Sequence, residues 1–369
     1  MFEPKYIITP KILSCLLEIE SDKTVADLVP VATEWELRLK NEALAKKIYF
    51  SLHFIGVDLS SSDISKIVTY DPGRDEKADE VALRAGVVAK ERDIQLVLNW
   101  LNANRFKDQL AYLEAKFKQT GFGEKDLIQM NSLLLEKTTP PQKLGLYRME
   151  DTAFEAGGKL STIPAVEISY QMEDFFRWFL STKEEMHPLI KAGISLYELM
   201  RMSPFEDGNL ITGVMFCSLV MDSFGYSFKQ FLSFEEALLR NREIFWMYLS
   251  TPEKKEEDLS EWLEYFLKSI SQVATDTKGK LMMLIGETPA FRSENGKVMP
   301  LTERQIAIME DLTLRGETTI KEIRSILPAI SDDTILMDLK DLIEKKMIKK
   351  KGKTKGATYV LGKSRGFRK

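Results

Sequence analysis

The chain has 369 residues, of which 44% are hydrophobic, enough to bury a sizeable core and to form two or three domains. Its two cysteines, Cys15 and Cys217, stand far apart in apolar segments, which predicts two core thiols and excludes a disulfide framework. No uncharged apolar run reaches about 18 residues, and the first residues lack a basic leader followed by an apolar run. The sequence therefore predicts a cytoplasmic protein and excludes membrane insertion and export.

The net charge of −4 is unevenly distributed along the chain. Between Glu344 and Lys369 there are eleven Lys or Arg and one acidic residue, so this segment carries +10 while residues 1–343 carry −14. Such a split predicts an anionic partner for the C-terminal segment. A solubilising basic tail is the alternative, and both remain open from the charge alone.

Residues 1–120 are predicted to form a helical region. Thr9-Pro10 combines a capping hydroxyl with a first-turn proline, the pattern that opens a helix. Residues 35–54 and 78–118 repeat apolar side chains at helical spacing. The turn residues 70–73, Tyr-Asp-Pro-Gly, separate two of these helices.

Residues 121–274 are predicted to form the central domain, and residues 275–300 a helix followed by a linker. The run Gly-Phe-Gly at 121–123 interrupts the helical pattern, which resumes over residues 124–136. Glycine and proline recur between residues 279 and 300, as is typical of a linker.

From Leu301 to Lys369 the pattern changes to three short helices followed by a basic hairpin. Helical spacing covers residues 301–314, 320–327 and 331–345, and strand-like runs cover residues 348–351 and 358–361. Ser331 is placed as the N-cap of the third helix. This arrangement resembles a winged helix-turn-helix domain.

The resemblance implies a DNA-binding role, but the third helix is acidic. Its carboxylates would be repelled by DNA phosphates, so the basic hairpin is the better candidate for phosphate contact. The candidate DNA-binding residues are Lys349, Lys350, Lys351, Lys353 and Lys355. A protein or dimer interface is the alternative role for the same module.

The segment from Ser203 to Val214 reads Ser-Pro-Phe-Glu-Asp-Gly-Asn-Leu-Ile-Thr-Gly-Val. It resembles the signature of the Fic family, HPFx[DE]GNGRxxR, at the five positions Pro204, Phe205, Asp207, Gly208 and Asn209. It departs from that signature at the four positions Ser203, Leu210, Ile211 and Val214.

The resemblance assigns a role to each signature position. In the family, the first His is the general base for AMP transfer to a protein hydroxyl, and the Asp or Glu binds magnesium. The loop amides and arginines hold the phosphates of ATP. The corresponding nucleotide-binding stretch here is Asp207, Gly208, Asn209, Leu210, Ile211, Thr212, Gly213 and Val214.

The departures remove the groups that this chemistry needs. The hydroxyl of Ser203 cannot accept a proton at pH 7, and losing a positioned base costs about 10²–10⁴-fold in rate. Ile211 and Val214 cannot neutralise phosphate charge. A helix start at Gly208-Asn209 still favours an anion, so weak, magnesium-dependent ATP binding at Asp207 stands beside the alternative of a purely structural turn.

The flanking segments extend the resemblance over most of the chain. Residues 189–200 resemble the helix that delivers the family loop, and residues 145–148 with 161–164 resemble the strand pair called the flap. The flap positions Ser161, Thr162 and Ile163 are implied to clamp a target protein. The implied fold is mainly α: a Fic-type helical bundle with a β-hairpin flap, followed by a small winged-helix α+β domain, in a family whose members commonly self-associate.

Many family members also carry an inhibitory helix reading Ser-x-x-Ile-Glu-Gly, whose Glu pairs with the last signature Arg. The nearest match here is Ser51-Leu52-His53-Phe54-Ile55-Gly56, with Ile55 at the position of the inhibitory Glu. A buried carboxylate without its arginine would be costly, so the absence of both groups is physically consistent. The sequence therefore favours a degenerate, regulatory scaffold, with an active transferase that uses a substitute base as the alternative.

Overall fold

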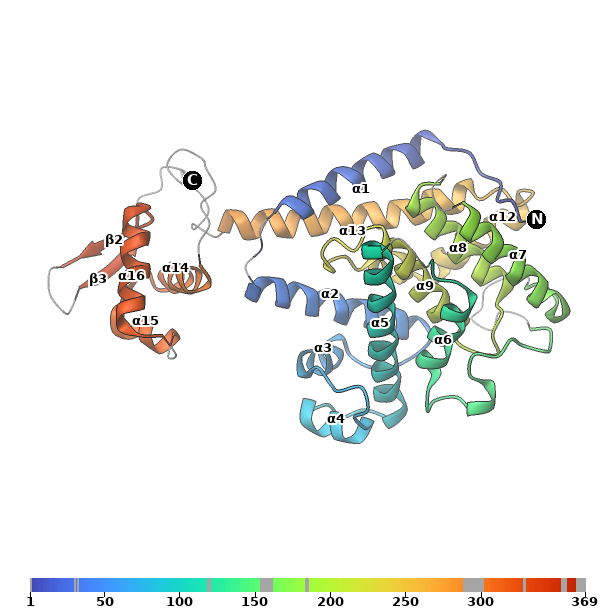
Figure 1. Cartoon of the computed structure of the whole chain (residues 1–369), viewed down its shortest axis with the longest axis horizontal. Helices are drawn as coiled ribbons and strands as arrows, with labels where there is room; N and C mark the ends of the chain where they lie inside the picture. The colour runs from blue at the N-terminus through green and yellow to red at the C-terminus, as the bar shows by residue number, and fades with distance from the viewer. Residues whose placement is uncertain are drawn as a thin grey trace. The chain divides into compact units, whose positions relative to one another are not determined.

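The computed structural model describes residues 2–29, 31, 33–117, 121–152, 162–182, 186–287, 302–327, 330–352 and 357–362. The chain divides into two compact units. Unit 1 comprises Met1–Leu28 and Arg38–Lys278, and unit 2 comprises Val29–Leu37 and Gly279–Lys369. Helices dominate both units and strands are few, which confirms the predicted mainly α fold class (Figure 1).

Five helices precede the central segment: α1 (Pro10–Leu28), α2 (Thr33–Phe54), α3 (Ser61–Tyr70), α4 (Ala78–Ala85) and α5 (Glu91–Phe117). The predicted helical stretch 78–118 is wrong in one respect, because it is broken between α4 and α5. Gly86 adopts φ 65° at the C-cap of α4, and its N–H donates to the carbonyl oxygens of Ala82 and Leu83. A glycine in the left-handed conformation ends a helix, even where the apolar spacing continues in the sequence beyond it.

The rest of unit 1 surrounds a helix that is apolar on every side. The remaining elements are α6 (Glu124–Leu135), η1 (Pro141–Lys143), η2 (Ala165–Glu167), α7 (Ile168–Ser181), α8 (Pro188–Met202), α9 (Asn209–Ser223), α10 (Phe234–Leu239), α11 (Arg242–Leu249), α12 (Thr251–Lys254) and α13 (Ser260–Glu287). All residues of α9 from Leu210 to Met221 are buried, and α9 packs against α5, α6 and α8. A helix without a polar face belongs to the interior of a domain.

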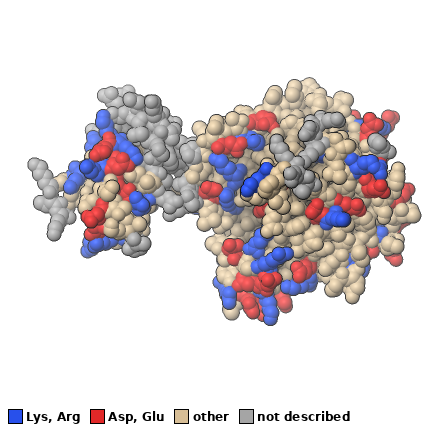
Figure 2. Space-filling model, viewed as in Figure 1, with Lys and Arg blue, Asp and Glu red and all other residues tan. Residues whose placement is uncertain are grey.

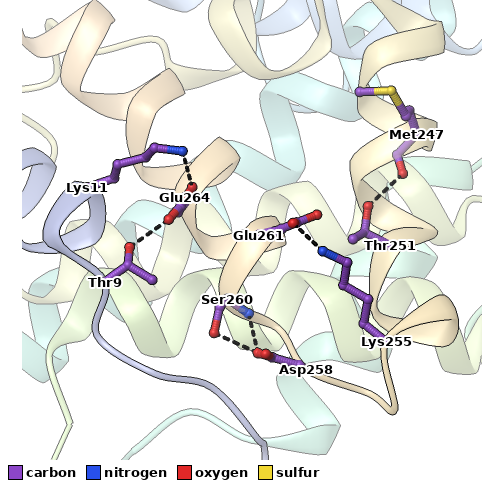
Figure 3. Close-up of polar contacts among 9 residues, drawn as sticks. All are labelled: Thr9, Lys11, Met247, Thr251, Lys255, Asp258, Ser260, Glu261 and Glu264. Atoms are coloured by element: carbon purple, nitrogen blue, oxygen red, sulfur yellow. Dashed lines mark hydrogen bonds and ion pairs between the residues drawn. The ribbon is translucent and has the colours of Figure 1, made fainter.

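Hydrogen bonds and an ion pair join the N-terminal segment to α13. Thr9 Oγ1 donates to Glu264 at 2.6 Å, and Lys11 Nζ pairs with the same carboxylate at 3.1 Å (Figure 3). Further along, Thr275 Oγ1 donates to Asp22 at 2.8 Å, and Asp22 is buried. α1 and α13 therefore run parallel, with polar bonds at both ends of the pair.

The described residues of unit 2 from 302 onward form three helices and a three-stranded antiparallel sheet in the order β1-β3-β2. Its elements are α14 (Glu303–Arg315), β1 (Glu317–Thr319), α15 (Ile320–Ile326), α16 (Asp332–Glu344), β2 (Ile348–Lys351) and β3 (Thr358–Leu361). The register pairs Glu317 with Val360 and Lys350 with Tyr359. Helices and strands share one core, which includes Ile308, Leu312, Ile323, Ile335, Leu339 and Tyr359. This arrangement fits a winged-helix-like module.

Among the residues that the structure describes, no helix combines the length and the apolar character needed to cross a membrane.

Candidate functional site

The signature-like loop reverses the chain between two core helices. Ser203 caps the end of α8 in the left-handed conformation, with φ 40°, and Gly208 is the left-handed N-cap of α9, with φ 73°. A Cβ atom on Gly208 would lie 3.0 Å from Leu135 Cδ1. Both the positive φ and this close approach favour glycine at 208.

Ser203 is buried, with a relative exposure of 1%. Its Oγ donates to the carbonyl oxygen of Met200 at 2.8 Å, and its backbone N–H donates to Leu199 O at 3.0 Å. The hydroxyl at the position of the family base is therefore directed at the last turn of α8. It caps a helix end and is not presented to a substrate.

Asn209 closes the loop on itself. Its Oδ1 accepts from the Phe205 N–H at 2.8 Å, and its Nδ2 donates to the Phe205 carbonyl at 2.9 Å. Phe205 is itself buried, so these two bonds satisfy backbone groups that water cannot reach. Asn209 thus has a structural function that does not require a bound nucleotide.

Arg148 joins the loop to both arms of the flap. Its guanidinium, in a side chain only 3% exposed, donates to four carbonyl oxygens. These belong to Ser203 at 2.9 Å, Glu150 at 2.9 Å, Ile163 at 2.5 Å and Met202 at 3.2 Å. Burial lowers the pKa of Arg148, against the opposing charges of Asp151 and Glu206.

The first arm of the flap pairs with the loop. Tyr147 and Phe205 form an antiparallel bridge, and the Arg148 N–H donates to Pro204 O at 2.9 Å. The described residues of the two arms, 145–152 and 162–164, do not pair with each other as strands, which corrects the predicted strand pair over this part. Thr162 Oγ1 instead donates to the Thr152 carbonyl. The flap residue Ser161 lies outside the described residues.

Asn131 on α6 is hydrogen-bonded to the loop, a role that was not predicted from the sequence. Its Nδ2 donates to Asp207 O at 2.9 Å and to Thr212 Oγ1 at 3.1 Å. Its Oδ1 accepts from the Gly145 N–H at 3.1 Å. The signal in the sequence was its spacing, because Asn131 follows Leu127 by four residues and precedes Leu134 by three, which places it on the apolar face of the helix. A polar residue on a buried face is normally hydrogen-bonded.

Residues 121–221 match the family model described as the Fic/DOC family. The chain therefore contains a Fic domain. The matched segment includes Asn131, Arg148 and the whole loop from Ser203 to Val214, so the polar contacts described above all lie within it.

Solved structures resemble the chain over a larger part of its length. A Fic family protein from Desulfovibrio desulfuricans G20 is 20% identical with a TM-score of 0.65, covering 100% of both chains. Fic-1 from C. elegans is 16% identical with a TM-score of 0.55, covering 75% of this chain and 73% of that one. A Fic domain containing signaling protein from Bacteroides thetaiotaomicron VPI-5482 is 14% identical with a TM-score of 0.51, covering 75% and 98%. At these identities the likeness establishes the fold. No curated protein matches the sequence.

The carboxylates of the Fic loop, Glu206 and Asp207, are exposed and make few polar contacts. Asp207 Oδ1 accepts from the Gly208 N–H at 2.7 Å, and Thr139 Oγ1 lies 3.4 Å from Asp207 Oδ2. Lys143 Nζ lies 3.4 Å from Glu206. Within the described part of the chain, no three His, Cys, Asp or Glu side chains are grouped to hold a metal ion. A magnesium ion at Asp207 would therefore need ligands from a nucleotide and from water.

The positions of the two signature arginines are occupied by core side chains. Ile211 and Val214 are each 2% exposed, and Leu210 is 5% exposed. Thr212 is bonded to Asn131, and Gly213 packs close to Leu196 and Met200. The first turns of α9 thus contribute to the interior of the Fic domain and offer no cation to a phosphate.

Ile55 and Val214 occupy different environments. Ile55 follows the end of α2 and is 42% exposed, whereas Val214 is in the core. The last residue of α2, Phe54, packs against Phe245 and Trp246 of α11, with ring centroids 5.3 and 5.9 Å apart. The position of the inhibitory Glu therefore lies just beyond the end of a helix that packs against α11.

The basic candidates of unit 2 are only partly described. Lys349, Lys350 and Lys351 are exposed on β2, whereas Lys353 and Lys355 lie outside the described residues. Residues 349 and 351 share one face of the strand and residue 350 points to the other, because side chains alternate along a strand. Figure 2 shows Lys and Arg side chains beside acidic ones on the visible surface of this unit.

Proposed function

We propose that the Fic domain of this chain is a scaffold that transfers no nucleotide, and that the chain has a regulatory role. The observation that carries the proposal is the burial of Ser203, whose hydroxyl donates to Met200 O at 2.8 Å. A side chain in that state neither accepts a proton nor reaches a target hydroxyl. Ser203 is therefore unsuited to act as the general base for two reasons: a hydroxyl cannot accept a proton at pH 7, and this hydroxyl is buried.

The missing cations support the same proposal. Nucleotidyl transfer places negative charge on the transferred group, which preorganised hydrogen-bond donors and cations stabilise in the transition state. Removing one such group costs about 10²–10³-fold in rate. Here both arginine positions are buried aliphatic side chains, 2% exposed. A protein that has lost base and arginines retains the loop because Asn131, Arg148 and Asn209 hold it as part of the fold.

The regulatory role is proposed to be exerted by the winged-helix-like module of unit 2. Its exposed lysines on β2 present positive charge to an anionic partner, and DNA phosphates are the partner that such a strand fits. The remaining wing lysines, Lys353 and Lys355, belong to the same basic segment of the sequence. DNA binding is therefore proposed to be governed by charge and to weaken steeply with salt.

An active protein AMP transferase with a substitute base is the second candidate. The exposed carboxylates of Glu206 and Asp207, just before the start of α9, favour it because an exposed Asp207 could contribute a ligand to a magnesium ion that accompanies ATP. Transfer would move AMP from ATP to a Ser, Thr or Tyr hydroxyl of a protein bound at the flap. Pyrophosphate would be the leaving group.

The two candidates are separated by incubating the chain with Mg²⁺ and ATP labelled at the α-phosphate, alone and with a cell lysate. The scaffold predicts no labelled protein beyond that seen with Asp207→Ala. Label transfer that is lost in Asp207→Ala would establish the second candidate. Calorimetric titration with Mg-ATP shows whether the loop binds nucleotide without reaction, and binding lost in Asp207→Ala assigns that binding to this loop.

A further inference from the structure

Helix α16 presents a face that the core of unit 2 leaves uncovered. Leu336 is 43% exposed, Met337 is 72% exposed, and the Lys340 side chain is 78% exposed. Asp333 and Glu344 are exposed on the same face, because positions 333, 337, 340 and 344 recur at helical spacing. The opposite face supplies the core residues Ile335, Leu339 and Leu342.

The chemistry of this face suits a protein better than a nucleic acid. Asp333 and Glu344 would repel phosphates, and Lys340 Nζ lies 4.0 Å from Glu344 and is partly neutralised by it. The side chains of Leu336 and Met337 gain free energy only when another apolar surface removes them from water. Apolar residues flanked by charges of both signs are typical of a protein interface.

We propose that this face of α16 is a self-association surface on which a second copy of the chain places its own α16 in the antiparallel direction. The register that puts Asp333 opposite Lys340 of the second copy also puts Leu336 opposite its Met337, because both pairs are centred between residues 336 and 337. The twofold symmetry repeats each contact. One helix pair thus gains two ion pairs and two apolar contacts.

Neighbouring registers are less favourable. A pair centred on Lys340 would place two lysines together. A pair that opposes Asp333 to Glu344 would place carboxylates together, and like charges in contact select against such an arrangement. A pair centred on residue 342 would oppose Lys340 to Glu344 but would place Leu336 and Met337 beyond the end of the second helix. Charges and apolar residues together therefore favour the proposed register, in which Leu336 and Met337 supply most of the association free energy.

A single helix pair buries a small area, so the dimer is expected to dissociate on dilution. Sedimentation-velocity ultracentrifugation of the full chain over a concentration series is expected to show a monomer–dimer equilibrium. Met337→Asp is expected to raise the dissociation constant by about 10-fold or more, since it buries an unpaired charge at the centre of the interface. Val88→Asp, at a residue of unit 1 that is 100% exposed, is the matched control and leaves the equilibrium unchanged.

Charge exchange tests the register. Asp333→Lys and Lys340→Asp are each expected to weaken the dimer about 10-fold, because each places like charges in contact twice. The double variant restores both ion pairs with their signs reversed and is expected to recover dimerisation. A folding defect in the single variants would not be repaired in this way, and far-ultraviolet circular dichroism checks that all three are folded.

Several outcomes overturn the proposal. These are a wild-type chain that stays monomeric throughout the series, a dimer that resists Met337→Asp, and a double variant no better than the single ones. Weakened binding to a DNA duplex with unchanged sedimentation would instead assign α16 to DNA. The proposal is independent of whether the Fic domain transfers nucleotide, so label transfer by the wild-type chain leaves it standing.

Discussion

The Nε of Arg148 donates to the carbonyl oxygen of Ser203 at 2.9 Å, joining the flap to the position of the family base. The same guanidinium reaches the carbonyls of Glu150, Ile163 and Met202. Its charge is therefore solvated by backbone dipoles, with Asp151 Oδ1 as the nearest ion-pair partner at 4.0 Å. The flap and the loop are held as one polar assembly inside the Fic domain.

Replacing Arg148 by Lys is expected to destabilise the protein by about 2–4 kcal/mol, because one ammonium group cannot satisfy four carbonyls, of which those of Ser203, Ile163 and Met202 accept in buried hydrogen bonds. The measurement is urea unfolding followed by tryptophan fluorescence. Arg177→Lys is the matched control: Arg177 is 52% exposed and pairs with Glu173 and Asp174 on its own helix. That control is expected to cost about 0–1 kcal/mol, and equal losses in both variants would contradict the structural role of Arg148.

Gly208→Ala is expected to cost more than Gly56→Ala, although both glycines have positive φ, at 73° and 90°. A Cβ on Gly56 meets nothing within 4 Å, so that variant reports only the backbone conformation, about 1–2 kcal/mol. A Cβ on Gly208 also displaces Leu135, for a total of about 2–4 kcal/mol. The same urea assay measures both, and equal costs would mean that Leu135 moves aside freely.

Apolar spacing and capping residues predicted most of the helices. The start of α1 follows from Thr9, whose Oγ1 accepts from the Ile12 N–H at 3.2 Å. The three helices and two of the strands of unit 2 were predicted to within about two residues. Strand β1 was missed because Glu317-Thr318-Thr319 is too short to show alternation, and it becomes a strand only by pairing with β3.

The candidate site was predicted in its position but not in its supports. The resemblance located the loop and the missing base and cations. The contacts of Arg148 with Ser203 and of Asn131 with Asp207 join residues 55 and 76 positions apart. Neither spacing nor composition carries information about such partners. The same limitation left open whether Ser203 faces a substrate, which depends on the left-handed end of α8.

Glu235 provides a prediction about pH, because burial raises its pKa above the ordinary value of 4.5. The folded state therefore binds more protons than the unfolded state once the pH exceeds about 4.5, and stability falls as the pH rises from there through the folded-state pKa. Glu235→Gln removes this contribution. Its stability relative to wild type, measured by urea unfolding, is expected to increase from pH 4.5 upward and then level off. A difference that stays constant with pH would contradict the shift.

The wing lysines provide the last prediction. Lys349 and Lys351 lie on one face of β2, so replacing both by Gln removes two adjacent positive charges from a surface proposed to meet DNA. Binding to a duplex of mixed sequence is expected to weaken, and the slope of log K against log salt is expected to fall by about 2. Fluorescence anisotropy over a salt series measures both quantities.

Lys90→Gln with Lys125→Gln is the matched control for the wing lysines. It removes two exposed lysines of unit 1 and the same net charge from the chain. If binding depended on the charge of the whole protein, both double variants would lose affinity equally. If it depends on phosphate contacts at β2, only the Lys349/Lys351 variant loses them. An unchanged salt slope in that variant would leave β2 without a role in DNA binding and would favour a protein partner for the module.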